Sequence, residues 1–180
     1  MVYEPEVYHL TPNKGAPNSD KPVLIYRDCL PLPISEEKTT EFLESHAWVK
    51  KGTWGHIDVR HFHPNTHECY GVFQGESTIL VGCGGIDPDD HGTKIDVSVG
   101  DVIVLPAGTG HCNLQSTQDY RYIGVYPDGA PPWRSELGKE PIDLTEMRKE
   151  TGSVLLPAED PVNGANGPLL SLWTQNKDSV

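Results

Sequence analysis

GHIDVRHFHPNTHECYGVFQGE, residues Gly55–Glu76, carries more information than any other stretch of this sequence. Eight consecutive positions hold three histidines and a carboxylate, namely His61, His63, His67 and Glu68. Two readings are open: a polar turn, or half of a metal site whose other half lies further along the chain. Since side chains alternate across a strand, a strand here would place Ile57, Val59, His61 and His63 on one face. Such a face is typical of a barrel interior with a polar end.

From Trp54 onward, short β-rich runs alternate with turns that contain Gly, Pro, Asn and Asp. The six runs are HIDVRHFH, CYGVFQ, STILVG, KIDVSV, DVIVL and YRYIGVY. Their length and spacing predict an all-β sandwich or barrel. After a turn at Pro64–His67, Glu68 would open the next strand and share a face with Tyr70, while His67 points to the other face.

The flanking segments predict a few further elements. Ser35 can cap a helix at about residues 35–46, because the two following glutamates suit its positive end. We expect a second short helix near residues 143–150 and a final strand at LLSLW, residues 169–173. The strand-like run VLIY lies at residues 23–26.

Length and composition indicate one ordinary globular domain. The chain has 180 residues, of which 22% are charged and 36% hydrophobic. We therefore predict an N-terminal arm, residues 1–34, that packs on a single domain formed by residues 35–180.

Charge and cysteine usage limit the partners and the compartment. The formal net charge of −12 argues against nucleic acid and against anionic membranes as partners. The start of the sequence shows no targeting signal, and the four cysteines show no CxxC spacing. We expect reduced thiols and a cytoplasmic location.

The other half of the candidate site lies in GDVIVLPAGTGHCNLQ, residues 100–115. VIVL predicts a strand, and PAGTG predicts a turn after which His111 begins another strand. Three imidazoles and one carboxylate are good ligands for a divalent first-row metal.

Both stretches resemble the two sequence motifs of the cupin superfamily. The first motif is matched by Gly55, His61, His63, Glu68 and Gly75. The second motif is matched by Gly100, Pro106, Gly108 and His111, whereas its final Asn is replaced by Gln115, with Asn113 the nearest. A more specific resemblance, from about residue 22 to residue 173, is to the YjlB-type cupins. It is carried by HxHxxxHE, PAGxGH, YPDG and DPVNGANGPLLSLW.

The resemblance implies a jelly-roll barrel, the double-stranded β-helix of cupins, with an N-terminal arm and one or two short helices. It also implies that one divalent transition metal (Fe, Mn, Ni, Zn or Co) is bound by His61, His63, Glu68 and His111. Four protein ligands on an octahedral ion would leave two positions for water, oxygen or substrate. The alternative is a metal-free cupin in which these side chains only form hydrogen bonds. Cupins often pair, so a homodimer is expected.

The leading functional hypothesis is a metal-dependent enzyme that acts on a small organic molecule in the barrel. Oxidoreductase chemistry of the dioxygenase type is slightly favoured, and an isomerase or lyase is the alternative within the same class. Glu68, His67 and Tyr70 are the candidate catalytic residues. For His67 three roles remain possible: a turn residue, a metal ligand or a proton shuttle. The rival hypothesis is a non-catalytic cupin that binds a small molecule.

Overall fold

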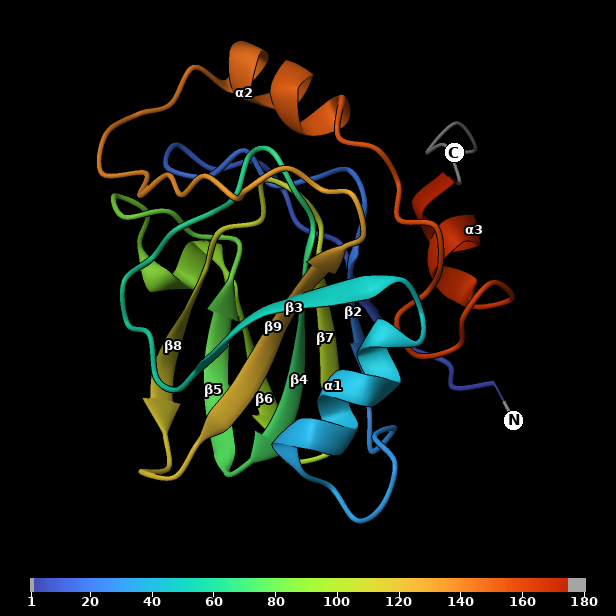
Figure 1. Ribbon diagram of the computed structural model, residues 1–180. Helices are drawn as coiled ribbons and strands as arrows, with labels where there is room; N and C mark the ends of the chain where they lie inside the picture. The colour runs from blue at the N-terminus through green and yellow to red at the C-terminus, as the bar shows by residue number, and fades with distance from the viewer. Residues whose placement is uncertain (1, 175–180) are drawn as a thin grey trace.

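Two antiparallel sheets face one another in the computed structural model, which describes residues 2–174 (Figure 1). The larger sheet has the order β1 (Glu6–Tyr8), β2 (Val23–Tyr26), β7 (Val102–Leu105), β4 (Glu68–Gln74), β9 (Arg121–Pro127) and β3 (Trp48–Trp54). The smaller sheet has the order β6 (Thr93–Ser98), β5 (Glu76–Val81) and β8 (His111–Ser116). The prediction of an all-β fold with few helices is confirmed.

The space between the sheets is filled by side chains that alternate along their strands. In β6, Ile95 and Val97 are buried while their neighbours face solvent. Inward-facing residues of both sheets form one apolar cluster that includes Ile25, Tyr70, Val72, Ile79, Val81, Ile95, Val97, Ile103 and Tyr122. Period-two alternation is what the sequence supplied, and burial of this face holds the two sheets together.

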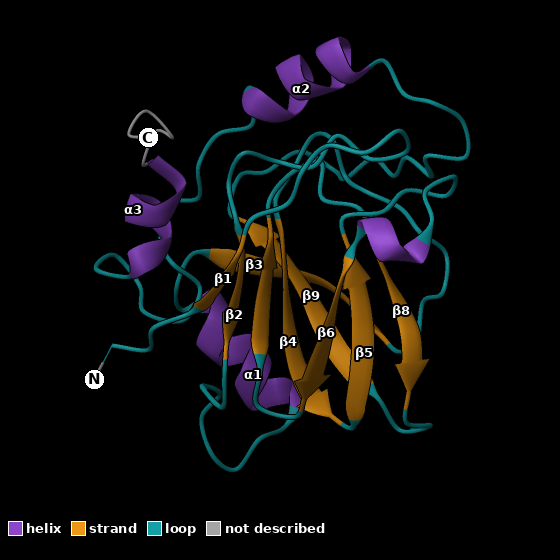
Figure 2. Cartoon of the chain, turned by 180° about the vertical axis from the view of Figure 1, so that it is seen from behind, coloured by secondary structure: helices purple, strands orange, loops and turns teal. Residues whose placement is uncertain are grey.

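The outer face of the larger sheet is also buried, because α1 (Glu36–Glu44) and α3 (Pro168–Thr174) lie against it (Figure 2). Gly71 of β4 permits the close approach of α1, since a Cβ there would lie 2.6 Å from Cγ2 of Thr39. Burial on both faces explains why β2 and β7 read as unbroken apolar runs.

Two predicted helices are present. Ser35 caps α1, its hydroxyl accepting a hydrogen bond from the Lys38 backbone amide at 3.2 Å. Asp143 caps α2 (Leu144–Gly152) in the same way, and a short 3₁₀ helix, η1 (Asp89–His91), precedes β6. No helix within residues 2–174 is long and apolar enough to cross a membrane. All four cysteines are buried and free, as expected for reduced thiols.

The N-terminal segment contributes directly to the larger sheet. β1 pairs with β2, and β2 pairs with β7, so residues 6–26 extend the sheet at one edge. The last residues of the expected domain, 175–180, lie outside the described residues.

The prediction of a strand over HIDVRHFH is wrong for most of its length. Residues 55–60 form no strand, and the chain pairs only through isolated bridges at His61 and Phe62. The strand that precedes them is β3, which pairs with β9. Asn113 holds the irregular segment instead: its side-chain oxygen accepts from the Ile57 backbone amide at 2.9 Å, and its backbone amide donates to the Ile57 carbonyl oxygen at 2.7 Å. Val59 is 50% exposed, so the inward face predicted for it does not exist.

The prediction of a final strand at LLSLW is also wrong, because these residues belong to α3. Leu169 and Trp173 are four positions apart, which places both on one face of a helix, and both are buried in the outer core. Pro168 suits the first helical position, since its missing amide hydrogen has no partner there in any helix. The Leu169 amide donates instead to Oδ2 of Asp160 at 3.1 Å.

Candidate metal centre

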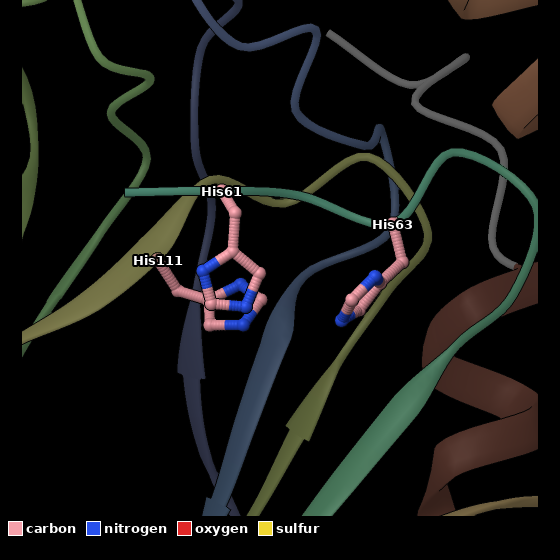
Figure 3. Close-up of side chains that lie close together, drawn as sticks. All are labelled: His61, His63 and His111. Carbon is pink, nitrogen blue, oxygen red and sulfur yellow. The ribbon is translucent and has the colours of Figure 1, made fainter. Parts of the chain in front are cut away.

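Three histidines meet at one end of the barrel, the end where β4 and β8 begin (Figure 1). His61 and His63 come from the irregular segment that leads to β4, and His111 is the first residue of β8 (Figure 3). One ring nitrogen from each lies within 4.8 Å of the others. His63 and His111 are buried, and His61 is partly buried. The separate sequence stretches therefore do converge in space.

Backbone carbonyls fix the orientation of all three rings. The Nδ1 atoms of His61, His63 and His111 lie 2.8, 2.8 and 2.9 Å from the carbonyl oxygens of Val59, Arg134 and Thr109. A carbonyl oxygen can only accept, so each Nδ1 carries the hydrogen and each Nε2 keeps a free lone pair. This is the tautomer in which histidine binds a metal through Nε2.

Glu68, the first residue of β4, lies beside two of these rings. Its Oε2 is 3.2 Å from Nε2 of His63 and 3.4 Å from Nε2 of His111. Its Oε1 accepts a hydrogen bond from the Tyr126 hydroxyl at 2.6 Å. The compact group of donors consists of the three histidines alone, and Glu68 lies at its edge.

The surroundings of the group shift the pKa values of His61, His63 and Glu68 in different directions. Burial and the neighbouring His111 lower the pKa of His61 to about 4. Burial also lowers the pKa of His63, but Glu68 raises it more, and the net shift is upward. Burial raises the pKa of Glu68, but the hydrogen bonds and charges of the His111 and His63 rings lower it by more. The net result is a pKa below the usual range of a glutamate.

Two buried atoms at the centre lack a hydrogen-bond partner anywhere in residues 2–174: Oε2 of Glu68 and Nε2 of His111. Buried polar atoms are rarely left unpaired, because their desolvation is costly. A cation among the Nε2 atoms would satisfy both atoms, and imidazole and carboxylate donors are those that divalent first-row metals take. The residues present therefore fit a metal ion.

The centre opens into a cavity of about 260 Å³ inside the barrel. Its walls are largely aromatic and aliphatic, comprising Trp54, Ile57, Tyr70, Tyr122, Tyr126, Trp133 and Leu137. Neither lysine nor arginine is among the described residues that line it. Arg60 and Arg121 lie elsewhere: Arg60 pairs with Asp89, and the guanidinium of Arg121 donates to the Tyr120 carbonyl oxygen.

Tyr70 and His67, two of the candidate catalytic residues, lie on opposite sides of the sheet. Tyr70 lines the cavity, with its ring centroid 5.9 Å from that of His111. His67 is 1% exposed, and its ring packs against Trp173 of α3 at a centroid distance of 4.7 Å. Burial and the charge of Lys21 lower the pKa of His67 to about 3. The structure thus brings Glu68 and Tyr70 to the histidine group and leaves His67 outside it.

Sequence reasoning missed the contribution of the segment that follows β9. Trp133 stacks on Tyr126 with ring planes 11° apart and centroids 5.2 Å apart. Nothing in the local sequence marks Trp133 as a cavity residue. Tyr126 could be identified as a cavity residue from the sequence. It lies four positions after Tyr122 in β9, so alternation along the strand places both side chains on the same, inward face.

Comparisons with known proteins agree with this geometry. A family model described as Cupin matches residues 48–125. The uncharacterized protein YjlB of Bacillus subtilis (strain 168) is 30% identical over 177 residues, which cover 97% of this chain and all of that protein. The chain belongs to the cupin family. Its two sheets are the jelly-roll barrel expected from the motifs.

Solved cupin structures show more distant likeness. Procruciferin, an 11S globulin of Brassica napus, is 12% identical, with 61% of this chain matched and a TM-score of 0.37. An oxalate decarboxylase of Bacillus subtilis, OxdC, is 22% identical, with 64% of this chain matched and a TM-score of 0.34. This cupin spans only 31% of the former chain and 28% of the latter. A DUF861 family protein of Thermotoga maritima is 20% identical, with 57% of this chain and 96% of that chain matched and a TM-score of 0.33.

Proposed function

We propose that this cupin is a mononuclear metal-dependent enzyme that acts on a small organic molecule in the barrel cavity. His61, His63 and His111 hold one divalent transition metal through Nε2, and Glu68 completes the ligand set through Oε2. One observation carries the proposal. Three carbonyl-bound imidazoles present free Nε2 lone pairs within 4.8 Å of one another, beside an unpaired buried carboxylate oxygen.

The bound metal would supply Lewis acidity, or redox chemistry with oxygen if it is iron or manganese. The chain's own residues then orient the ligands and the substrate. Tyr126 holds Oε1 of Glu68 and so directs Oε2 toward the histidines. Burial raises the pKa of Tyr70 well above its ordinary value, so the phenol stays protonated at neutral pH. Tyr70 can therefore donate a hydrogen bond to a substrate oxygen and does not act as a base.

The cavity indicates the substrate class. Aromatic walls favour a flat, largely apolar molecule, and the lack of a cationic side chain in the described lining disfavours a dicarboxylate. Oxygen-dependent oxidation is our first choice of reaction, and isomerisation or elimination at the same centre is the second.

The first test is elemental analysis of protein purified without chelators. The proposal expects close to one equivalent of transition metal in the wild type and a strong loss in His111→Ala. His9→Ala is the matched control, since His9 is exposed and lies outside the centre. Well under one equivalent in the wild type, with no stabilisation when metal is added, would contradict the proposal.

The second test is turnover by the loaded protein of two compound panels, uncharged aromatic compounds and dicarboxylates, with and without oxygen. Product formed only with oxygen supports the oxidoreductase, and product formed equally without oxygen supports the isomerase or lyase. Turnover of dicarboxylates alone would overturn the substrate class, and no turnover by fully loaded protein would favour a binding protein.

A further inference from the structure

Segment 132–137 forms part of the wall of the cavity at the histidine group, although it lies outside both sheets. Two backbone hydrogen bonds of 2.9 Å each, one in each direction, join Glu136 to Phe62 in an antiparallel bridge. Alternate residues of the extended segment therefore face the cavity. They are Trp133, Ser135 and Leu137.

The same segment orients one of the three histidines. The carbonyl oxygen of Arg134 accepts a hydrogen bond from Nδ1 of His63 at 2.8 Å. The other two histidine rings donate to carbonyl oxygens only two positions earlier in their own segments, those of Val59 and Thr109. The direction of His63 alone thus depends on how a distant part of the chain is held.

Glu68 competes for the ring hydrogen of His63. Its Oε2 lies 3.2 Å from Nε2 of His63, so a hydrogen on Nε2 would be donated to the carboxylate. That tautomer would leave no lone pair on Nε2 for a metal. The shorter contact between Nδ1 and the Arg134 carbonyl oxygen opposes it, whereas the Ser135 hydroxyl is 3.4 Å from Nδ1 and contributes less.

Asn65 fixes the position of this carbonyl group. Its Nδ2 donates to the Pro132 carbonyl oxygen at 2.9 Å, and its Oδ1 accepts from the Arg134 backbone amide, also at 2.9 Å. The guanidinium of Arg134 adds ion pairs with Glu136 and Glu150. These pairs lie at the surface, where ion pairs contribute little, so the two bonds of Asn65 are the main local support.

We propose that Asn65 is a positioning residue for the metal centre. It holds the Arg134 carbonyl oxygen against Nδ1 of His63, which keeps the ring hydrogen on Nδ1 and leaves Nε2 free to bind the metal. The effect of Asn65 on the tautomer requires no metal, whereas its effect on metal affinity rests on the proposed function.

The tautomer is tested by NMR correlation of the ring nitrogens and hydrogens of the metal-free protein at about pH 9, where free imidazole is neutral. Wild-type His63 should carry its hydrogen on Nδ1, and Asn65→Ala should move part of the population to Nε2. The signals of His61 and His111 should stay, because their acceptors are local. Unchanged His63 signals, or equal changes in all three rings, would overturn the proposal.

Asn163→Ala is the matched control. The Asn163 side chain also joins two distant segments, accepting from the Tyr3 amide at 2.8 Å and donating to the Tyr3 carbonyl oxygen at 2.9 Å. Both asparagines are partly buried, so the two variants lose similar bonds, and Asn163→Ala should leave all ring signals unchanged. Arg134→Ala removes the ion pairs but keeps the backbone carbonyl group. A shift of the His63 signals in Arg134→Ala but not in Asn65→Ala would contradict the role of Asn65.

Metal affinity is the second readout, measured by competition between the protein and a chromophoric chelator for Zn²⁺. Asn65→Ala should bind Zn²⁺ about three- to tenfold more weakly than wild type and Asn163→Ala, the usual effect of one net hydrogen bond. Wild-type affinity in Asn65→Ala, despite a changed tautomer, would overturn the link to metal binding. A wild type that binds no metal would contradict the proposed function, while the tautomer would still decide whether Asn65 positions His63.

Discussion

The Tyr126 hydroxyl donates a 2.6 Å hydrogen bond to Oε1 of Glu68, which joins the end of β9 to the start of β4 at the floor of the centre. Both side chains are buried, and the second carboxylate oxygen faces the histidines. Hydrogen bonds to the outer atoms of metal ligands fix their direction. The position of Glu68 therefore depends on a residue distant from it in the sequence.

Tyr126→Phe should weaken metal binding by about tenfold or more, because Glu68 loses the bond that orients it. Competition with a chromophoric chelator measures this affinity. Tyr120→Phe is the control: the Tyr120 hydroxyl is buried without a hydrogen-bond partner in the described chain, so its removal should not reduce affinity. Equal affinities for the wild type and Tyr126→Phe would show that Glu68 does not need this support.

His111→Ala should remove most of the metal and leave the fold intact. The cluster between the sheets is apolar and does not include His111. Circular dichroism and thermal unfolding of the metal-free protein should therefore resemble those of metal-free wild type. Global unfolding of the variant would mean that the imidazole is part of the structural core.

Metal occupancy should fall as the pH is lowered from about 7.5 to about 4.5, because protons compete for the Nε2 lone pair of His63, whose pKa Glu68 raises, whereas His61 with a pKa of about 4 is protonated only at the lower end. The sign follows from the free ligands, which bind protons at low pH and metal at high pH. Dialysis at fixed free metal, followed by elemental analysis, measures the change. Occupancy constant over this range would argue against histidine ligation.

Gly71→Ala should destabilise the protein by about 1–3 kcal/mol, as expected for overpacking. The new Cβ would lie 2.6 Å from Cγ2 of Thr39 and 3.0 Å from Cδ1 of Leu43, so α1 would have to move away from β4. Gly152→Ala is the control, because nothing lies within 4 Å of a Cβ at this last residue of α2. Denaturant unfolding should show the control to be neutral or slightly more stable than wild type. Equal stability of Gly71→Ala and wild type would show that the contact is not tight.

The two errors in the predicted elements have different physical causes. The segment from Gly55 to Phe62 has strand-forming residues, but it bonds only to Asn113 and through isolated bridges at His61 and Phe62, and it forms no continuous ladder with a neighbouring strand. LLSLW is short and apolar, so periodicity could not distinguish a buried strand from a buried helix. The helix is favoured because it places Leu169 and Trp173 on one face, where both are buried in the outer core.

The sequence alone determined the β-strands from β4 to β9, the cap of α1, the approximate position of α2, and the identity of the histidines that come together. Those features depend on the alternation of apolar and polar residues, on capping residues and on motif spacing. All of these can be recognised within short, contiguous stretches of the sequence. Tertiary structure alone decided the packing of His67 against Trp173 of α3, the bond from Tyr126 to Glu68, and the place of Trp133 in the cavity wall. These depend on contacts between segments far apart in the chain, and such contacts form only when burial brings the sheets, loops and helices together.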